Sequence, residues 1–205
     1  MKDLVVLVAD GTMQKVVEEI LLRVPRSSGT SDFTFDVIPN IGHDSGCYND
    51  SHELLRSFST QYRFAMVIFD FEGSGVEIKS INEIENDVER LLDNHGWQNR
   101  NSVAVINPEL ENWIWQDSPH IEEAFGWENN TPLYQWCRTE GLIAHGDSKP
   151  IRPKETTQRV LKFTRTPFSS AIHKKIAKVV SYKRCTDRAF LKILNQLKNW
   201  FPRHS

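Results

Sequence analysis

A short apolar run that ends in two carboxylates constrains the fold of this chain most. Residues 64–69 are all apolar, and Asp70, Glu72, Gly73 and Gly75 follow them. An uninterrupted run of this length is typical of a strand buried on both faces. In extended backbone, residues two apart point the same way, so Asp70 and Glu72 are expected to face one point beyond the strand. Either a cation lies between them, or they belong to an acidic turn in which both carboxylates are solvated.

Three further segments are predicted to be strands of the same sheet, at residues 4–9, 33–38 and 102–106. Apolar residues recur at helical spacing between the strands, over residues 13–24, 51–62 and 81–94. Strands that alternate with helices predict an α/β fold, with one mostly parallel sheet and helices on both faces. Residues 40–50 are predicted to form a loop because they are rich in glycine and short polar residues.

Several helix limits follow from the residues at the ends of these segments. Thr12 is predicted as the N-cap of the first helix, with Asp10 as the alternative, and Pro25 is predicted to end that helix. Pro108 suits the first position of the helix that follows the last strand. The C-terminal part is predicted to contain helices at residues 153–163, 169–180 and 186–200.

Carboxylates follow three of the predicted strands. Asp10 comes after the first, Asp70 and Glu72 after the third, and Glu109 and Glu111 after the last. Parallel strands bring such junctions to one edge of a sheet, so Asp10, Asp70, Glu72 and Glu111 are expected to converge there. The alternatives are a capping role for Asp10 and complementation of a helix dipole by the two glutamates.

The charge is distributed very unevenly along the 205 residues. Residues 145–205 carry 15 Lys or Arg and 3 Asp or Glu, whereas residues 1–144 carry 10 and 24. We therefore expect an α/β core over residues 1–144 and a basic helical extension over residues 145–205, packed on the core. Such a basic segment indicates a polyanionic partner. The alternative is that the basic extension neutralises the acidic core internally.

Two further features bear on the compartment. Cys47, Cys137 and Cys185 are far apart, and their spacing predicts neither a zinc site nor a disulfide framework. This is typical of a reducing compartment, so a cytoplasmic location is expected. No apolar stretch is long enough to span a membrane, so a membrane partner is not expected.

The acidic junctions, taken together with motifs near the C-terminus, resemble the TOPRIM family. That family has an acidic residue and a glycine after its first strand, here Asp10-Gly11, and a D-x-D after a later strand, here residues 70–72. The segment Pro108-Glu-Leu-Glu-Asn-Trp113 resembles small stand-alone TOPRIM-like proteins related to OLD-type nucleases, many of them tied to bacterial antiphage defence. The C-terminal motifs of this resemblance are Lys149-Pro150, Lys175-Ile-Ala-Lys178 and the Cys-x-x-x-Phe that starts at Cys185.

The resemblance implies a Rossmann-like sheet and metal-assisted cleavage of phosphodiesters. Asp70, Glu72 and Glu111 would hold Mg²⁺ or Mn²⁺, with Asp10 as a further ligand or the general base. Lys154, or alternatively Lys149, would neutralise charge in the transition state. Two departures from the family bear on activity, because Asp10 stands where glutamate is usual and Glu72 replaces the second aspartate of D-x-D.

The resemblance also implies a nucleic-acid partner, DNA or RNA, held through its backbone by the basic extension. The residues assigned to this role are Lys149, Lys174, Lys175 and Lys178. For Lys149 and Lys154 the alternative is a role in loop solubility only.

A second function belongs to a different class. The acidic site would be degenerate, and the chain would be a non-catalytic subunit that binds partner proteins or nucleic acid in a defence complex. An aromatic patch would then serve for docking, unless its members belong to the core; its candidates are Trp113, Trp115, Trp127 and Trp136.

Overall fold

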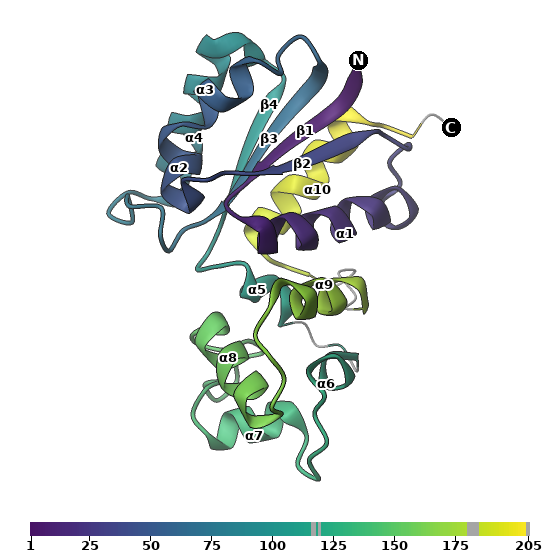
Figure 1. Ribbon diagram of the computed structural model, residues 1–205, viewed down its shortest axis with the longest axis vertical. Coiled ribbons are helices and arrows are strands. Elements are labelled where there is room, and N and C mark those ends of the chain that lie inside the picture. The colour runs from purple at the N-terminus through teal and green to yellow at the C-terminus, as the bar shows by residue number, and fades with distance from the viewer. Residues whose placement is uncertain (116–117, 119, 180–184, 204–205) are drawn as a thin grey trace.

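The computed structural model describes residues 1–115, 118, 120–179 and 185–203. Its sheet has the order β2-β1-β3-β4, and every pair of neighbouring strands is parallel (Figure 1). The strands are β1 (Lys2–Val8), β2 (Phe35–Pro39), β3 (Tyr62–Asp70) and β4 (Asn101–Ile106). The predicted α/β fold with a parallel sheet is confirmed.

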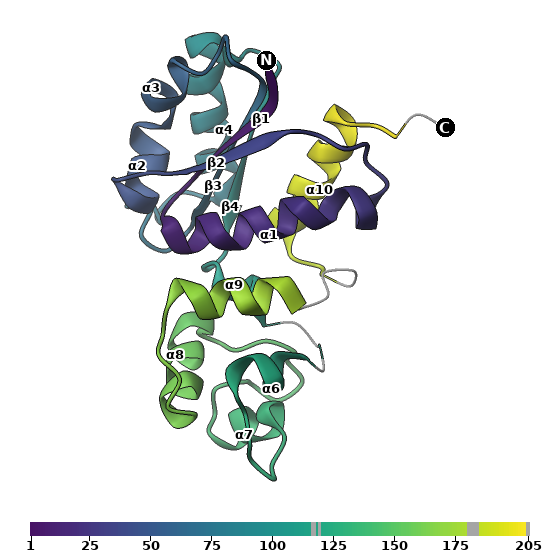
Figure 2. The ribbon, with the colours of Figure 1, turned by 45° about the vertical axis from the view of Figure 1, so that its right-hand side comes forward.

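Helices cover both faces of the sheet, as predicted (Figure 2). One face carries α1 (Gly11–Ser28) and α10 (Arg188–Trp200), and the other carries α2 (His43–Asn49), α3 (Ser51–Arg56) and α4 (Ile81–Leu92). A π-helical turn, η1 (Asp93–Trp97), continues α4. The two layers bury residues 4–8 of β1 and 65–69 of β3, which explains why these strands contain continuous apolar runs.

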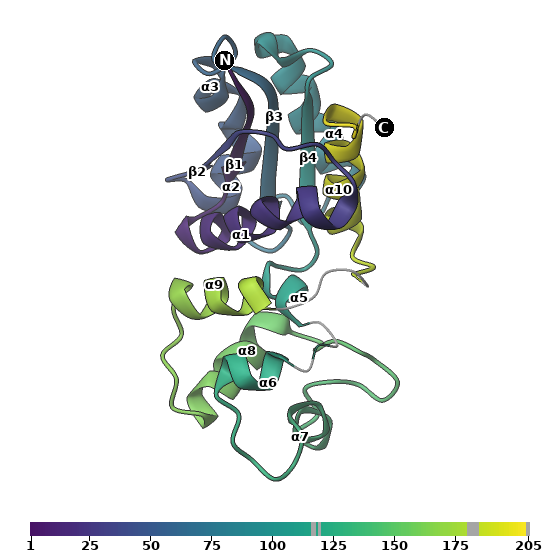
Figure 3. The same ribbon diagram turned by 90° about the vertical axis from the view of Figure 1, so that its right-hand side faces the viewer.

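A second group of helices lies beyond the carboxyl edge of the sheet (Figure 3). It consists of α5 (Glu111–Ile114), α6 (His120–Phe125), α7 (Leu133–Thr139), α8 (Pro153–Phe163) and α9 (Ser170–Val179). These helices enclose a core of their own, which contains Trp115, Phe125, Trp127 and Leu161. Trp115 and Trp127 are therefore buried in this helical core, and Trp113, which is 1% exposed, is buried in the core around the sheet. Three of the four tryptophans of the candidate aromatic patch thus belong to a core.

The two cores do not divide the chain between residues 144 and 145. The helical core combines Phe125 and Cys137 with Val160 and Ile176. Helix α10 instead returns to the sheet and joins the core there. The basic residues of the C-terminal part therefore lie in two places, some in the helical group and some on α10 against the sheet. None of the described helices is long and apolar enough to cross a membrane.

The first helix differs from its predicted limits at both ends. Its N-cap is Asp10, whose Oδ1 accepts hydrogen bonds from the N–H groups of Thr12 and Met13, both at 2.8 Å. The prediction of Thr12 is wrong because Asp10 ends the extended backbone after β1, and its carboxylate reaches both free N–H groups. Pro25 lies inside the last turns, and the helix ends at Gly29 in the left-handed conformation.

Three other predicted boundaries are wrong for tertiary reasons. Residues 43–49 form helix α2 instead of a loop, and its Gly46 packs against the side chain of Asn40, where a Cβ atom would lie within 3.1 Å of that side chain. The helix predicted over residues 51–62 is only α3, and Tyr62 opens β3. Pro108 precedes α5, and its carbonyl accepts a hydrogen bond from the Glu72 N–H at 3.1 Å, which ties this segment to the loop after β3.

A buried carboxylate ties the last helix to the sheet. Glu85 of α4 is 2% exposed and accepts a hydrogen bond from the Val105 N–H of β4 at 3.0 Å. Arg188 and Lys192 of α10 contact the same carboxylate, at 2.7 and 3.0 Å. These contacts lower the pKa of Glu85 although burial alone would raise it. Part of the basic extension therefore neutralises the acidic core internally.

We expect Glu85→Ala to lower the free energy of unfolding by about 2 kcal/mol at neutral pH, less than the roughly 3–5 kcal/mol found for fully buried pairs, because Arg188 and Lys192 retain access to water. Urea unfolding measures this change. Glu128→Ala, at an exposed position, is the matched control. Equal losses in the two variants would contradict a role for Glu85 in holding α10.

Candidate functional site

A pocket lies where the carboxyl edge of the sheet meets α8. Its volume is about 350 Å³. Helix α2, the β3–α4 loop, the β4–α5 loop and α8 supply its lining, which consists of Asp44, Glu72, Gly73, Glu109, Arg152, Lys154 and Glu155. Carboxylates and cations face each other across this pocket, as expected for a site at the ends of parallel strands.

Asp70 carries the least satisfied group at this edge. Its Oδ1 atom is buried and has no hydrogen-bond partner within the described ranges, although the residue as a whole is half-buried. Burial and then the charges of Asp44 and Glu111 raise the pKa of Asp70 well above its usual value, and the Leu110 N–H opposes them only in part. The ionised form of Asp70 is therefore disfavoured unless a cation faces it.

Asp44 was not identified from the sequence, but its carboxylate binds the backbone at the end of β3. Its Oδ1 accepts a hydrogen bond from the Asp70 N–H at 2.8 Å. Burial raises its pKa in spite of this bond. The only available signal was a lone aspartate among glycines, which also fits an ordinary loop, and helix α2 is what brings it to the site.

Lys154 and Glu109 join α8 to the acidic edge. The Lys154 N–H donates to Glu109 Oε1 at 2.7 Å. Burial alone would lower the pKa of the Lys154 ammonium, but Glu111, Glu109, Asp70 and Asp44 together raise it. Burial likewise raises the pKa of Glu109. Lys154, predicted as a catalytic residue, thus faces the carboxylates themselves and offsets part of their charge.

Glu111 forms a buried pair with a histidine that the sequence analysis missed. His173 Nε2 lies 2.9 Å from Glu111 Oε1, and the two side chains are 0% and 5% exposed. The Ser169 carbonyl faces Nδ1 at 2.9 Å, so that nitrogen carries a hydrogen. Burial alone would lower the pKa of His173, but the hydrogen bond to Glu111 and the nearby charge of Asp10 raise it. A histidine on the apolar face of α9 was the available signal.

The four predicted ligands share one electrostatic network. Asp10 faces Asp44 and His173, whereas Glu72 is exposed and faces Glu109 and Arg152. Their oxygen atoms are not all at ligand spacing, however. In the parts of the chain that the structure describes, the one group of three possible ligand residues within 4.8 Å of one another lies elsewhere.

The lysines assigned to nucleic acid have different environments. Lys149 is half-buried, donates to the Asn112 carbonyl at 2.7 Å, and has a pKa lowered by burial. Lys174 lies 3.4 Å from Glu19 of α1. Lys175 and Lys178 are exposed on α9. Of these four, the last two present the most accessible charge.

Comparison with protein-family models, with curated proteins and with solved structures gives no match for this chain. The function must therefore be argued from the chemistry of the site.

The Glu111–His173 pair predicts a specific dependence of stability on pH. Because the folded-state pKa of His173 is raised above 6.5, the stabilisation by the pair is complete below that pH and is lost as pH rises through the raised value. His173→Gln is expected to cost about 3 kcal/mol at pH 5.5, because it leaves Glu111 buried without a charged partner, and clearly less at pH 9.

Urea unfolding of wild type and variant between pH 5.5 and 9 tests this difference. His145→Gln, at an exposed position, controls for the loss of any histidine. A wild-type-minus-variant difference that stays constant across this range would contradict the assignment of a charged pair.

Proposed function

We propose that this chain cleaves phosphodiester bonds in nucleic acid with the help of Mg²⁺ or Mn²⁺. The observation that carries the proposal is the buried Oδ1 of Asp70, which has no partner among the described residues, on a carboxyl whose pKa is raised by burial and by the charges of Asp44, Glu111 and Glu109. Neighbouring carboxyl groups all ionise readily only when a cation compensates their negative charges. The resemblance to TOPRIM-like proteins supplies the reaction class and suggests a role in antiphage defence.

The chemistry of the donors suits a hard divalent cation, and binding would have to draw them together, because among the described residues no three carboxylates here have ligand atoms within 4.8 Å of one another. Mg²⁺ and Mn²⁺ prefer carboxylate oxygens, and here Asp70 has an oxygen without a partner while Asp44 and Glu109 have carboxylates with raised pKa values. Asp70, Asp44 and Glu109 would hold the ion, with Glu72 at the exposed rim of the pocket. A bound ion would polarise the phosphate and lower the pKa of the attacking water.

The other residues of the pocket would bind and orient the substrate. Lys154 and Arg152 line it and are placed to attract a phosphate group. Asp10 Oδ1 is occupied by two N–H groups of α1, so Asp10 would position the helix and supply negative charge. Glu111 is held by His173, so it would act on Asp70 through its charge.

One observation favours the rival function of a non-catalytic subunit. Lys154 and His173 already offset part of the negative charge in the site, as internal cations do in a cluster that has become purely structural. The two functions differ in whether a metal ion binds at Asp70 and whether a substrate is cut.

Thermal unfolding with and without Mn²⁺ separates them. Wild type is expected to melt at higher temperature with Mn²⁺, through preferential binding to the folded state. Asp70→Asn is expected to abolish this gain while raising the melting temperature of the metal-free protein at pH 8, because it removes a buried charge and relieves repulsion. Glu128→Gln should respond to Mn²⁺ as wild type does. An equal metal response in wild type and Asp70→Asn would contradict the site.

Cleavage of labelled single- and double-stranded DNA and RNA tests the activity itself. Wild type is expected to cut at least one of them only when Mg²⁺ or Mn²⁺ is present, and Asp70→Asn and Lys154→Ala are expected to reduce the rate by about 10²-fold or more. If Mn²⁺ binds at Asp70 but no substrate is cut, the non-catalytic function is the better one.

The salt dependence of nucleic-acid binding tests whether the exposed face of α9 contacts the nucleic acid. Changing Lys174, Lys175 and Lys178 together to Glu is expected to weaken nucleic-acid binding and to reduce the slope of log K against log[salt] by about 2–3, roughly 0.9 for each duplex phosphate that the variant no longer neutralises. Lys198→Glu, at an exposed position of α10, is the control. An unchanged slope, or no binding by wild type at low salt, would leave internal neutralisation as the only role of these charges.

A further inference from the structure

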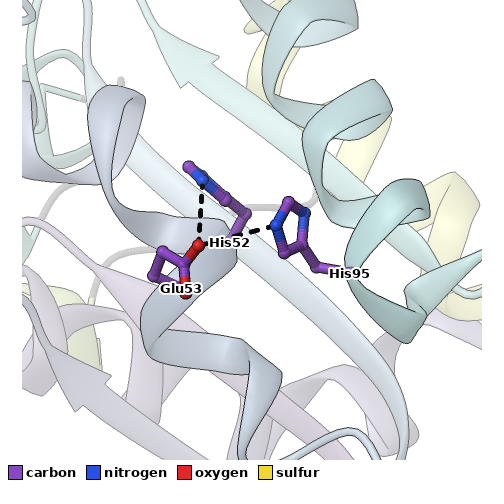
Figure 4. A group of neighbouring side chains, drawn as sticks. All are labelled: His52, Glu53 and His95. Carbon is purple, nitrogen blue, oxygen red and sulfur yellow. Dashed lines mark ion pairs between the residues drawn. The ribbon is translucent and has the colours of Figure 1, made fainter.

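Two histidines and a glutamate lie close together (Figure 4). They lie near the amino ends of the strands, whereas the acidic pocket lies at the carboxyl edge of the sheet. His52 and Glu53 lie on α3, and His95 lies in η1. These segments lead into the amino ends of β3 and β4. One possible ligand atom from each residue lies within 4.8 Å of the others. We propose that His52, Glu53 and His95 form a binding site for a divalent transition-metal ion of the Zn²⁺ type.

The distances suit a small tetrahedral ion. Glu53 Oε1 lies 3.8 Å from His52 Nε2 and 3.6 Å from His95 Nε2. Ligand atoms bound at 2.0–2.1 Å to tetrahedral Zn²⁺ lie roughly 3.3 Å apart, so a movement of a few tenths of an ångström brings both pairs to that spacing. Both contacts are too long for hydrogen bonds between these groups.

The second nitrogen of His95 is held as in many metal sites. Its Nδ1 lies 2.7 Å from the Leu91 carbonyl, which can only accept a hydrogen bond. In the neutral ring the hydrogen is therefore on Nδ1, and the lone pair of Nε2 is directed toward Glu53 and His52. A backbone carbonyl that fixes the tautomer in this way is the usual second partner of a metal-bound histidine.

His52 provides an independent observation. Its Nδ1 is buried and has no hydrogen-bond partner in the described ranges, and the side chain is 16% exposed. Its Nε2 lies 3.8 Å from Glu53 Oε1, which is too long for a hydrogen bond. An imidazole with such poor hydrogen bonding is costly to bury, and a metal bond at Nε2 would compensate part of that cost.

The backbone holds these side chains in place. At η1 the chain turns through Gly96, whose φ of 91° strongly favours glycine. Trp97 is fully buried and donates its indole N–H to the Leu55 carbonyl of α3 at 3.1 Å. Arg100 stacks over Trp97 at 4.5 Å and donates to the Ser59 carbonyl at 2.7 Å. This arrangement fixes η1 against α3, so the site is largely preformed.

The ligand chemistry selects the class of metal. Imidazole nitrogen suits Zn²⁺ and its neighbours in the transition series, whereas Mg²⁺ and Ca²⁺ prefer oxygen. Glu53 is 60% exposed, so a fourth position would be open to water. The site is separate from the proposed nuclease centre and does not depend on it.

Titration calorimetry with ZnCl₂ on the metal-stripped full chain tests the proposal. Wild type is expected to bind Zn²⁺ at a saturable site, and Glu53→Gln and His95→Gln are each expected to weaken this binding at least about tenfold. Two variants are expected to keep it: His120→Gln, at an exposed histidine, and Asp70→Asn, at the carboxyl edge of the sheet. Visible absorption of the Co²⁺-loaded protein should show a four-coordinate spectrum that both site variants lose.

Absence of saturable Zn²⁺ binding in wild type would overturn the proposal. So would unchanged affinity in the site variants, or loss of binding in Asp70→Asn alone, which would place Zn²⁺ in the acidic pocket. Because Glu53 is exposed, Glu53→Gln should fold normally, and its result decides the matter if His95→Gln does not fold.

Discussion

Negative charge at the carboxyl edge of the sheet is the constraint on which the rest of the structure depends. The parallel strands bring Asp70 to the carboxylates of neighbouring loops, and a buried oxygen of Asp70 is left without a partner in the part of the chain that the structure describes. The helical group beyond this edge supplies two cations, Lys154 from α8 and His173 from α9. Electrostatic attraction therefore explains the position of this helical group, as does the burial of apolar surface.

The sequence was sufficient for the strands because burial on both faces leaves a simple pattern. Each predicted strand agrees with an observed one to within two residues at either end. Boundaries failed where a tertiary contact outweighed local propensity, as with Gly46 and Asn40 in α2. Capping by Asp10, the alternative to Thr12, is confirmed. No periodic pattern could have revealed these packing contacts.

The sequence could predict only those residues of the candidate site that directly follow a strand. Asp70 and Glu111 follow strands, and their place at one edge depends on parallel pairing alone. Asp44 and His173 come from helices whose docking depends on distant residues, and their local sequence gives only weak signals that also fit a loop aspartate and a core histidine. The sequence likewise could not show which basic residues are neutralised internally. Arg188 and Lys192 pair with Glu85, whereas Lys175 and Lys178 remain exposed.

The return of α10 to the sheet has a consequence for how the chain acquires its structure during synthesis. Phe201 stacks on Phe33 with 4.4 Å between ring centroids, and Trp200 stacks on Phe64 of β3 at 4.6 Å. One face of the sheet therefore lacks part of its cover until residues 188–201 have left the ribosome. The helices α5 to α9 emerge before that cover. The nascent sheet must meanwhile expose apolar surface, which is the condition under which chaperones bind.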